Sequence, residues 1–210
     1  MRAWIYDKAI LGLTTRWYGE VLERLPQGAH LLDVGIGTGG ALAKNAELLR
    51  AGDVRVTGVD IDPDYVKRAR KRMEKAGLSD RVDVLLESIY DHQGGPYDAI
   101  YFSASFMLLP EPAVALQHVQ GLLSPRGRIY FTQTFQDKES KVMEKVKPML
   151  KAATTIDFGR VTYESDFRDV VAAGGVRLTE LSVMGRKGTR SYRLAVGVPD
   201  AMGGDGAAAV

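Results

Sequence analysis

The sequence predicts an α/β domain built on a doubly wound, mostly parallel seven-stranded sheet that ends in an antiparallel strand hairpin. Short apolar segments rich in Val, Ile and Leu are bounded by Gly, Asp or Pro, which is typical of buried parallel strands. Segments with helical periodicity lie between them, and the chain finishes with two apolar segments joined by a short glycine-containing connection. Alternation of this kind indicates parallel strands linked by right-handed helical crossovers.

The composition supports one folded domain. The chain has 210 residues, 45% hydrophobic and 26% charged, which excludes a wholly disordered protein. It has no cysteine, which excludes disulfides, thiolate zinc sites and cysteine nucleophiles. The net charge of +2 is too small to direct the protein to nucleic acid or anionic membranes. No stretch approaches the roughly 20 apolar residues that span a bilayer, and the charged N-terminus is unlike a signal peptide, so we expect a cytoplasmic protein.

The first half of the chain carries the parallel strands. Strands are predicted at His30–Val34, Val54–Asp60, Val82–Leu86 and Ala99–Phe102. One helical face is formed by Leu42, Ala46 and Leu49, and another by Val66, Ala69, Met73 and Ala76, with Gly77 as its C-terminal stop. A third helix is predicted from about Pro112 to Leu123.

The second half contains the antiparallel ending. A turn at Ser124–Gly127 leads into a strand at Arg128–Thr134. A helical insert containing Pro148 lies within residues 136–175, near the expected substrate, and its last helix ends at Gly174-Gly175. The hairpin strands are Val176–Met184 and Ser191–Val198. We therefore expect a single domain at residues 1–199, with a helical lid segment at 1–28 and a disordered tail at 200–210.

The strongest local signal is a glycine-rich turn between the first strand and the next helix, in the segment His30-Leu-Leu-Asp-Val-Gly-Ile-Gly-Thr-Gly-Gly40. Glycines there permit tight backbone angles and close approach of a ligand to the main chain. Gly35, Gly37 and Gly40 also satisfy the spacing of dinucleotide-binding folds, so the glycines alone do not identify the ligand.

Two acidic residues narrow the choice of ligand. Asp33 lies near the end of the first strand, where a carboxylate repels a pyrophosphate but suits an ammonium group; the alternative is a loop or helix cap. Asp60 ends the second strand at the position where an acid accepts the hydroxyls of a ribose. S-adenosylmethionine has an ammonium, a ribose and no phosphate. Asp62 and Pro63 are expected to start the following helix.

With these motifs the chain resembles the class I S-adenosylmethionine-dependent methyltransferases, which have a Rossmann-like fold. The resemblance covers about residues 28–135 through LLDVGIGTGG, VTGVDID, PYDAIYFSASFMLLPEP and GLLSPRGRIYF, in that order. The pattern is most similar to the small-molecule branch that includes ubiquinone- and menaquinone-biosynthesis methyltransferases. It implies transfer of a methyl group to a small-molecule acceptor by direct in-line displacement, with S-adenosylhomocysteine as product.

The resemblance also implies positions for the cofactor. Asp33, Gly35, Gly37 and Gly39 surround the methionine part, Asp60 holds the ribose, and Ile61 packs beside the adenine. The family usually has an acid and a small residue after the third strand, and here the segment is Glu87-Ser88-Ile89, so either Glu87 or Ser88 reads the adenine amino group. Ser103, after the fourth strand, lies near the methionine backbone.

The acceptor is expected at the segments that follow the fourth and fifth strands, because ligands of open α/β sheets bind at the carboxyl ends of strands. These segments contain Ser105, Phe106, Met107, Gln133, Thr134 and Phe135, with Tyr163 closing over them. Some of these side chains alternatively face the core. His92 is the one candidate general base, or else a loop histidine, and the scattered histidines predict no metal site.

The N-terminal segment is rich in aromatic residues. Trp17, Val21 and Leu25 fall at helical spacing and are explained by core packing, whereas Trp4 and Tyr6 either form a lid over the substrate or pack conventionally. The basic run Lys67–Arg72 reads as the solvated face of a helix rather than a nucleic-acid stripe.

Other functions remain open at this point. An RNA or protein methyltransferase is the nearest alternative, although Ser103-Ala-Ser-Phe106 replaces the N-P-P-[YF] sequence often found where exocyclic amines of bases are methylated. A nicotinamide oxidoreductase is disfavoured by Asp33. A non-catalytic S-adenosylmethionine-binding module shares every cofactor motif. The acceptor atom and the oligomeric state are not encoded in any of these motifs.

Overall fold

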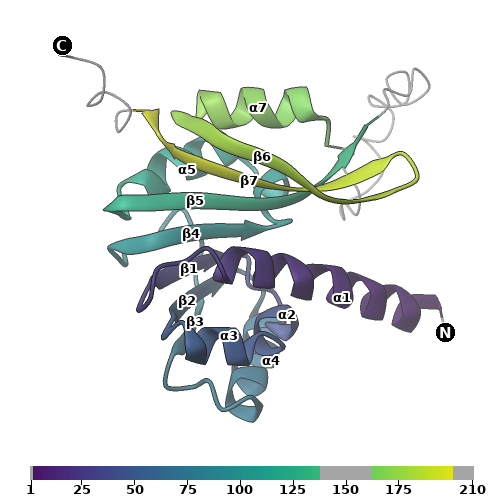
Figure 1. Cartoon of the computed structure of the whole chain (residues 1–210). Helices are drawn as coiled ribbons and strands as arrows, with labels where there is room; N and C mark the ends of the chain where they lie inside the picture. The colour runs from purple at the N-terminus through teal and green to yellow at the C-terminus, as the bar shows by residue number, and fades with distance from the viewer. Residues whose placement is uncertain (1, 138–161, 201–210) are drawn as a thin grey trace.

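The computed structural model describes residues 2–137 and 162–200, with side chains from residue 11 onward. A seven-stranded sheet has the order β3-β2-β1-β4-β5-β7-β6 (Figure 1). Five strands are parallel, and β7 runs antiparallel to both β5 and β6. The strands are β1 His30–Val34, β2 Arg55–Asp60, β3 Val82–Leu86, β4 Tyr97–Ser103, β5 Leu123–Gln136, β6 Val176–Lys187 and β7 Arg190–Pro199. The predicted fold class is confirmed.

Helices cover both faces of the sheet. The helical elements are α1 Arg2–Leu22, α2 Gly40–Ala43, α3 Ala46–Ala51, α4 Pro63–Lys75, the short η1 Phe106–Leu108, α5 Pro112–Gln120 and α7 Glu164–Ala173. Side chains of α1 to α4 share one hydrophobic core, and those of α5 and α7 share the other. The N-terminal part of α1 extends past the edge of the sheet (Figure 1).

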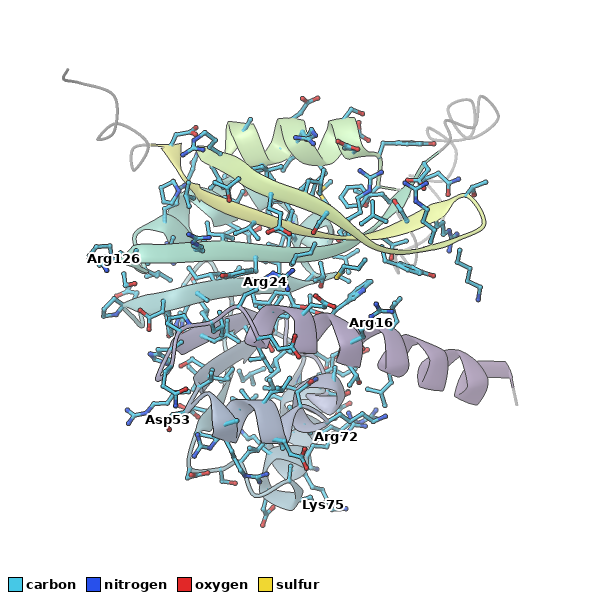
Figure 2. The ribbon with its side chains drawn as sticks, in the orientation of Figure 1. Arg16, Arg24, Asp53, Arg72, Lys75 and Arg126 are labelled. Atoms are coloured by element: carbon cyan, nitrogen blue, oxygen red, sulfur yellow. The ribbon has the colours of Figure 1, made fainter. Side chains whose placement is uncertain are left out.

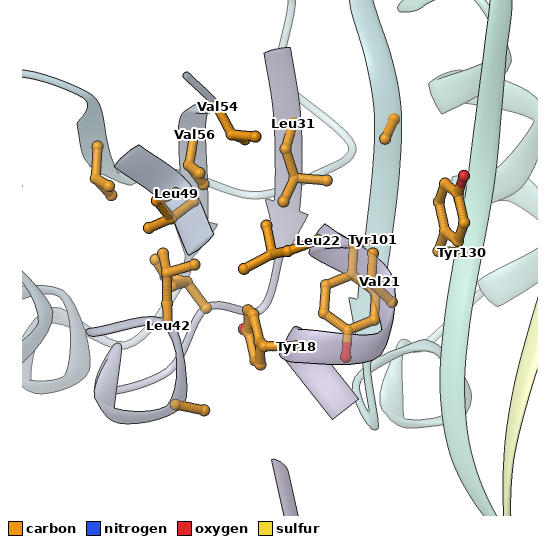
Figure 3. Packing of buried hydrophobic residues seen from close by; sticks show 14 of the residues in the cluster. Tyr18, Val21, Leu22, Leu31, Leu42, Leu49, Val54, Val56, Tyr101 and Tyr130 are labelled. Atoms are coloured by element: carbon orange, nitrogen blue, oxygen red, sulfur yellow. The ribbon is translucent and has the colours of Figure 1, made fainter. Parts of the chain in front are cut away.

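The two cores differ in composition. Under α1 to α4 the core is mainly aliphatic, with Tyr18 of α1 packed near Val21, Leu22 and Tyr101 (Figure 3). Beneath α5 and α7 lies an aromatic cluster formed by Phe102, Phe106, Phe131, Phe135 and Phe167. Trp17 is 2% exposed and Val21 is fully buried, as their helical spacing predicted.

Two predicted helices have different limits. The helix expected through Leu42 and Leu49 is divided into α2 and α3, because the side chain of Asn45 donates to the backbone oxygens of Thr15 and Ala41, each at 2.9 Å. The helix expected to reach Leu123 ends at Gln120, and Leu123 begins β5. The predicted turn at Ser124–Gly127 lies inside β5, where the pairing with β4 shifts register.

Helix α4 is held at its start and along its basic face. Asp62 caps it by accepting the backbone N–H groups of Asp64 at 2.8 Å and Tyr65 at 3.2 Å, as predicted. Arg70 donates to the Val84 carbonyl at 2.9 and 2.7 Å, and Arg72, labelled in Figure 2, donates to the Thr38 carbonyl at 2.8 Å. Two cations of the basic run therefore fasten α4 to β3 and to the glycine loop.

Some expectations fall outside the described residues. These are most of the helical insert with Pro148, the tail from residue 201 onward, and the side chains of Trp4 and Tyr6. Within the part that is described, no helix is long and apolar enough to cross a membrane. The same residues contain no cluster of His, Cys, Asp or Glu suited to a metal ion.

Candidate cofactor and acceptor site

The glycine loop joins β1 to α2 and is fixed by hydrogen bonds to the neighbouring strand. The backbone N–H groups of Gly35 and Ile36 donate to the Val59 carbonyl at 2.9 and 3.2 Å. Gly35 has φ +78°, and a Cβ there would lie 2.8 Å from the Cβ of Ser105. Glycine is therefore required at this position by both the backbone angle and the close approach of the segment after β4.

The side chain of Ile36 points from the loop onto the sheet. A Cβ at Gly58 of β2 would lie 2.4 Å from Cδ1 of Ile36, closer than any real contact. The absence of a side chain at residue 58 thus creates the space that seats the loop. This contact fixes the position of the loop relative to β2.

Asp60 stands at the carboxyl end of β2, beside the loop. One carboxylate oxygen accepts the Gly37 N–H at 2.8 Å, and the other accepts the Asp62 N–H at 3.0 Å. Each oxygen keeps a further lone pair, so the group can still accept the two hydroxyls of a ribose. The next residue, Ile61, is 75% exposed, and Leu86 at the end of β3 is 54% exposed. These apolar side chains offer an uncovered surface on which an adenine ring can pack.

A cavity of about 470 Å³ opens beside the glycine loop. It is bounded by the loop itself, by α1 and by α4, and among the described residues its lining contains no histidine or acid. Of the predicted cofactor residues, Gly35, Gly37, Gly39 and Ser103 line it. The other lining residues are Leu11, Thr14, Tyr18, Ile36, Thr38, Gly40, Ala41, Tyr65, Arg68 and Arg72.

Asp33 lies behind this cavity and has no exposed surface. Its Oδ2 accepts the Tyr18 hydroxyl at 2.7 Å, and its Oδ1 is buried without a hydrogen-bond partner among the described residues. Burial is the main cause that raises the pKa of Asp33 to about 7; the Tyr18 hydrogen bond opposes the rise and Asp60 adds to it. A buried carboxyl with an unused oxygen suits a cationic ligand group, so these residues fit the ammonium of S-adenosylmethionine.

The segment after β3 is placed less simply than the resemblance implied. The Glu87 N–H donates to the Asp60 carbonyl at 3.0 Å, and Ser88 Oγ accepts the Tyr90 N–H at 3.3 Å, so both residues adjoin the end of β2 and β3. Ile89, in contrast, is 4% exposed and packs in the aromatic core. The structure does not discriminate between Glu87 and Ser88 as the adenine contact, and it gives Ile89 a packing role.

His92 is not placed as a general base. It is 4% exposed, with Nδ1 2.8 Å from Glu87 Oε2 and Nε2 2.7 Å from the Tyr97 hydroxyl. Both ring nitrogens are thus engaged, and the residue is not part of the cavity lining. His118 is half-buried, and its ring nitrogen lies 2.7 Å from the His92 carbonyl oxygen. These histidines connect the β3–β4 segment to α5.

Of the expected acceptor residues, Phe106 lies in the core, whereas Ser105 and Gln133 form hydrogen bonds to other segments. Phe106 is 1% exposed and contacts Phe102, Phe131 and Phe167 edge-on, so its assignment to the acceptor site is wrong: its ring fills the core. Ser105 donates to the Val34 carbonyl. Gln133 donates to Thr162 Oγ1 at 3.1 Å. Tyr163, the residue after Thr162, is half-buried. The side chain of Tyr6 lies outside the described residues.

Sequence reasoning missed several residues that line or border the cavity. Tyr18 was noted only as one of several aromatics, although Leu11, Thr14 and Tyr18 recur at helical spacing and share one face of α1. Leu86 was taken only as the last strand residue, although an apolar residue at a strand end beside Asp60 is a usable signal. No local pattern distinguished Arg72, which holds the glycine loop, from its basic neighbours.

The strand order, the glycine loop and the acid at the end of β2 agree with the fold that the resemblance to class I S-adenosylmethionine-dependent methyltransferases implied. Residues 32–129 match the family model described as a methyltransferase domain. The match covers 98 of the 210 residues, a little under half of the chain, and the chain is similar to this family over that segment.

Two relatives and one solved structure illustrate the likeness. The chain is 37% identical over 118 residues to a protein-L-isoaspartate O-methyltransferase of Thermococcus onnurineus, covering 53% of this chain and 51% of the relative. It is 34% identical over 114 residues to a ubiquinone biosynthesis O-methyltransferase of Xylella fastidiosa, covering 52% and 44% respectively. The crystal structure of the cyclase SpnF superposes with a TM-score of 0.69 at 18% identity, covering 88% of this chain and 81% of that one.

These matches cover only part of each relative, so they do not assign a relative's whole activity to this chain. The chain spans about half the length of the curated relatives it matches, 51% and 44%. The structural likeness at 18% identity shows the fold alone, and the superposed protein is named for a cyclisation. The matched residues 32–129 contain the glycine loop and Asp60, so the similarity includes the part of the chain expected to bind the cofactor.

Proposed function

We propose that the protein transfers the methyl group of S-adenosylmethionine to a small-molecule acceptor by direct in-line displacement. The observation that carries the cofactor assignment is Asp33, a fully buried carboxyl with an unpartnered oxygen behind the glycine loop. A carboxylate in that position favours an ammonium and opposes a pyrophosphate, which argues against nicotinamide dinucleotides. Asp60 and the exposed Ile61 and Leu86 supply the matching ribose and adenine contacts.

The residues of the chain act mainly by binding and orientation. Bound S-adenosylmethionine supplies a methyl group already activated on a positively charged sulfur. Asp60 holds the adenosine end and the glycine loop surrounds the methionine part, while Leu11, Thr14 and Tyr18 of α1 form a wall of the cavity and limit access of water. Alignment of two reactants can supply the greater part of the rate in such a displacement.

The acceptor should need little help from a base. The described cavity lining has no histidine or carboxylate, and His92 is engaged on both ring nitrogens. An acceptor with an acidic hydroxyl or an unprotonated nitrogen fits this lining, because only protonated nucleophiles demand a general base at neutral pH. We place oxygen acceptors first, since both curated relatives named above are O-methyltransferases.

A protein acceptor is the second candidate, and the similarity to a protein-L-isoaspartate O-methyltransferase favours it. One screen separates the two. The purified protein is incubated with labelled S-adenosylmethionine and with phenols, carboxylic acids, amines, thiols or an isoaspartyl peptide. Turnover of a small phenol or acid supports the proposal, and turnover of the peptide alone supports the second candidate.

The screen is paired with a binding measurement. Calorimetry should show binding of S-adenosylhomocysteine and none of NAD, with Asp60→Ala as the matched variant that loses the ribose acceptor. Binding without turnover of any acceptor would indicate a non-catalytic binding module. Binding of NAD instead would contradict the cofactor assignment.

A further inference from the structure

The position of Asp33 raises a question of access, because the carboxyl that should attract the cofactor's ammonium has no surface in the cavity. Asp33 is fully buried, and its Oδ1 has less than 1 Å² exposed. Tyr18 of α1 does line the cavity, together with Gly35 and Ser103. Its hydroxyl lies 2.7 Å from Asp33 Oδ2. Of this hydrogen-bonded pair, Tyr18 is therefore the residue that borders the cavity.

The Tyr18 hydroxyl is held in a defined orientation. Its ring packs edge-on against Tyr101 of β4, with centroids 5.0 Å apart and an interplanar angle of 84°. The hydroxyl proton is directed to Asp33, since an ionised carboxylate can only accept. The Tyr18 oxygen has two lone pairs. One accepts a hydrogen bond from Ser103, which lowers the pKa of Tyr18, and the other is left for a further donor.

We infer that the Tyr18 hydroxyl oxygen holds the ammonium of the cofactor, and that Asp33 is a positioning residue that acts through Tyr18. Asp33 accepts the hydroxyl proton and so makes the phenolic oxygen a stronger acceptor for the ammonium. This assignment deepens the proposed function and rests on it. It replaces the direct Asp33 contact that the sequence indicates with a two-residue relay from β1 to α1.

The charge of Asp33 links this contact to pH. The groups that face Asp33 are Tyr18 from α1, Asp60 from the end of β2, and Tyr101 from β4. Burial and Asp60 raise the pKa of Asp33 and the Tyr18 hydrogen bond lowers it, to a value of about 7. Ammonium binding favours the ionised form, so affinity should rise as pH increases through about 7. Removal of the Tyr18 hydroxyl should abolish this rise, because Asp33 then has no link to the ammonium.

A double-mutant cycle tests the relay. We would measure binding of S-adenosylhomocysteine by calorimetry for the parent protein, Tyr18→Phe, Asp33→Asn and the double variant. The relay predicts a loss of about tenfold for each single variant and again about tenfold for the double variant, because either change breaks the same contact. A loss near hundredfold in the double variant, or unchanged binding in Tyr18→Phe, would overturn it.

A second ligand separates the relay from general damage to the site. Methylthioadenosine has the adenosine and the sulfur but lacks the amino acid group, so its affinity should stay within about threefold in every variant. An equal loss for both ligands would overturn the relay and indicate a structural role for Tyr18. Tyr130→Phe is the matched control, because Tyr130 belongs to the same core cluster and forms no contact with Asp33.

The pH series provides a readout that packing alone would not move. Because the ligand's own titration is common to all proteins, the affinity ratio of Tyr18→Phe to the parent is compared between pH 6 and 8.5. The relay predicts that the midpoint near 7 disappears in both Tyr18→Phe and Asp33→Asn. A midpoint that persists at higher pH in Tyr18→Phe would indicate direct contact with Asp33 and would overturn the relay. If Tyr18→Phe does not fold, 3-fluorotyrosine at position 18 keeps the ring, weakens the oxygen as an acceptor and should give a smaller loss of the same sign.

The failure of this inference can be distinguished from failure of the proposed function. If the parent protein binds neither S-adenosylhomocysteine nor methylthioadenosine, the cofactor assignment is wrong and the relay falls with it. If the parent binds both ligands equally well, the adenosine site is right and the ammonium contact is absent. Additive variants with normal parent binding overturn the relay alone.

Discussion

The carboxyl edge of the sheet has two halves that are built in different ways. We call the ends of β1, β2 and β3 the cofactor half. The surface there is formed by the backbone of the glycine loop, one half-buried acid and two exposed apolar side chains. After β4 and β5, in the aromatic half, the side chains turn inward, and Phe106, Phe131 and Phe135 pack on Phe167 of α7. The first half is open to a ligand, and the second is closed by packing.

This difference shows where function can be carried by a short motif. In the cofactor half, glycines and acids act through local backbone geometry, so their roles follow from neighbouring residues. In the aromatic half, the position of each ring depends on elements far away in the chain. Phe106 follows β4 and Gln133 lies near the carboxyl end of β5, yet the first fills the core and the second donates to Thr162.

The largest effect that would sharpen this comparison is expected for Phe106→Ala. Loss of a fully packed ring should lower the free energy of unfolding by about 3–5 kcal/mol, measured by urea denaturation. Affinity for S-adenosylhomocysteine in the folded protein should stay within about threefold. Leu108→Ala is the control, because Leu108 lies in the same η1 turn and is 62% exposed. Unchanged stability with a raised acceptor KM would return Phe106 to the acceptor site.

His92→Ala should also act on stability. It leaves the Tyr97 hydroxyl and Glu87 without their partner, which should cost about 2–3 kcal/mol of unfolding free energy. If His92 were a catalytic base instead, the variant would keep its stability and lose turnover with an altered pH profile. Thermal unfolding and acceptor kinetics on the same preparation decide between these outcomes.

Asp60→Ala should act mainly on binding, with a smaller loss of stability from the Gly37 and Asp62 N–H groups that Asp60 accepts. Two hydrogen bonds from ribose hydroxyls to a charged acceptor are lost, so S-adenosylhomocysteine should bind about 2 kcal/mol more weakly, roughly thirtyfold. Calorimetry measures the change directly. A variant that titrates like the parent would show that Asp60 serves only the Gly37 and Asp62 N–H groups seen in the structure.

Asp62→Ala gives the smallest effect and is the natural partner of Asp60→Ala. Asp62 caps α4 through the N–H groups of Asp64 and Tyr65, so its loss should cost about 1 kcal/mol of unfolding free energy. Cofactor affinity should remain within about threefold. Should Asp62→Ala weaken binding as much as Asp60→Ala does, the two acids would share one role, and the cofactor half would be less local than described.

Sequence patterns predicted the fold almost completely, because each strand has a periodicity of its own and ends near a glycine, proline or charged residue. The errors lie where tertiary contacts override periodicity, as at Asn45, whose side chain binds Thr15 of α1 and divides a helix. The glycine loop at Gly35 and Gly37, and the acid Asp60 at the end of β2, were likewise predicted from local sequence. The cover of Asp33 by Tyr18 was not, since it depends on how α1 crosses the sheet. Nor was the burial of Phe106, which requires knowledge of where α7 packs.

The seating of Ile36 on Gly58 has a consequence for how variation in this protein should be interpreted. The two positions draw on one volume, because any side chain at residue 58 would occupy the space that Ile36 fills. A library that changes one residue at a time would score both positions as intolerant. A paired library that trades a smaller residue at 36 for a larger one at 58 would find combinations that fold. Residues 36 and 58 should therefore be varied together in engineering, because their side chains share one fixed volume.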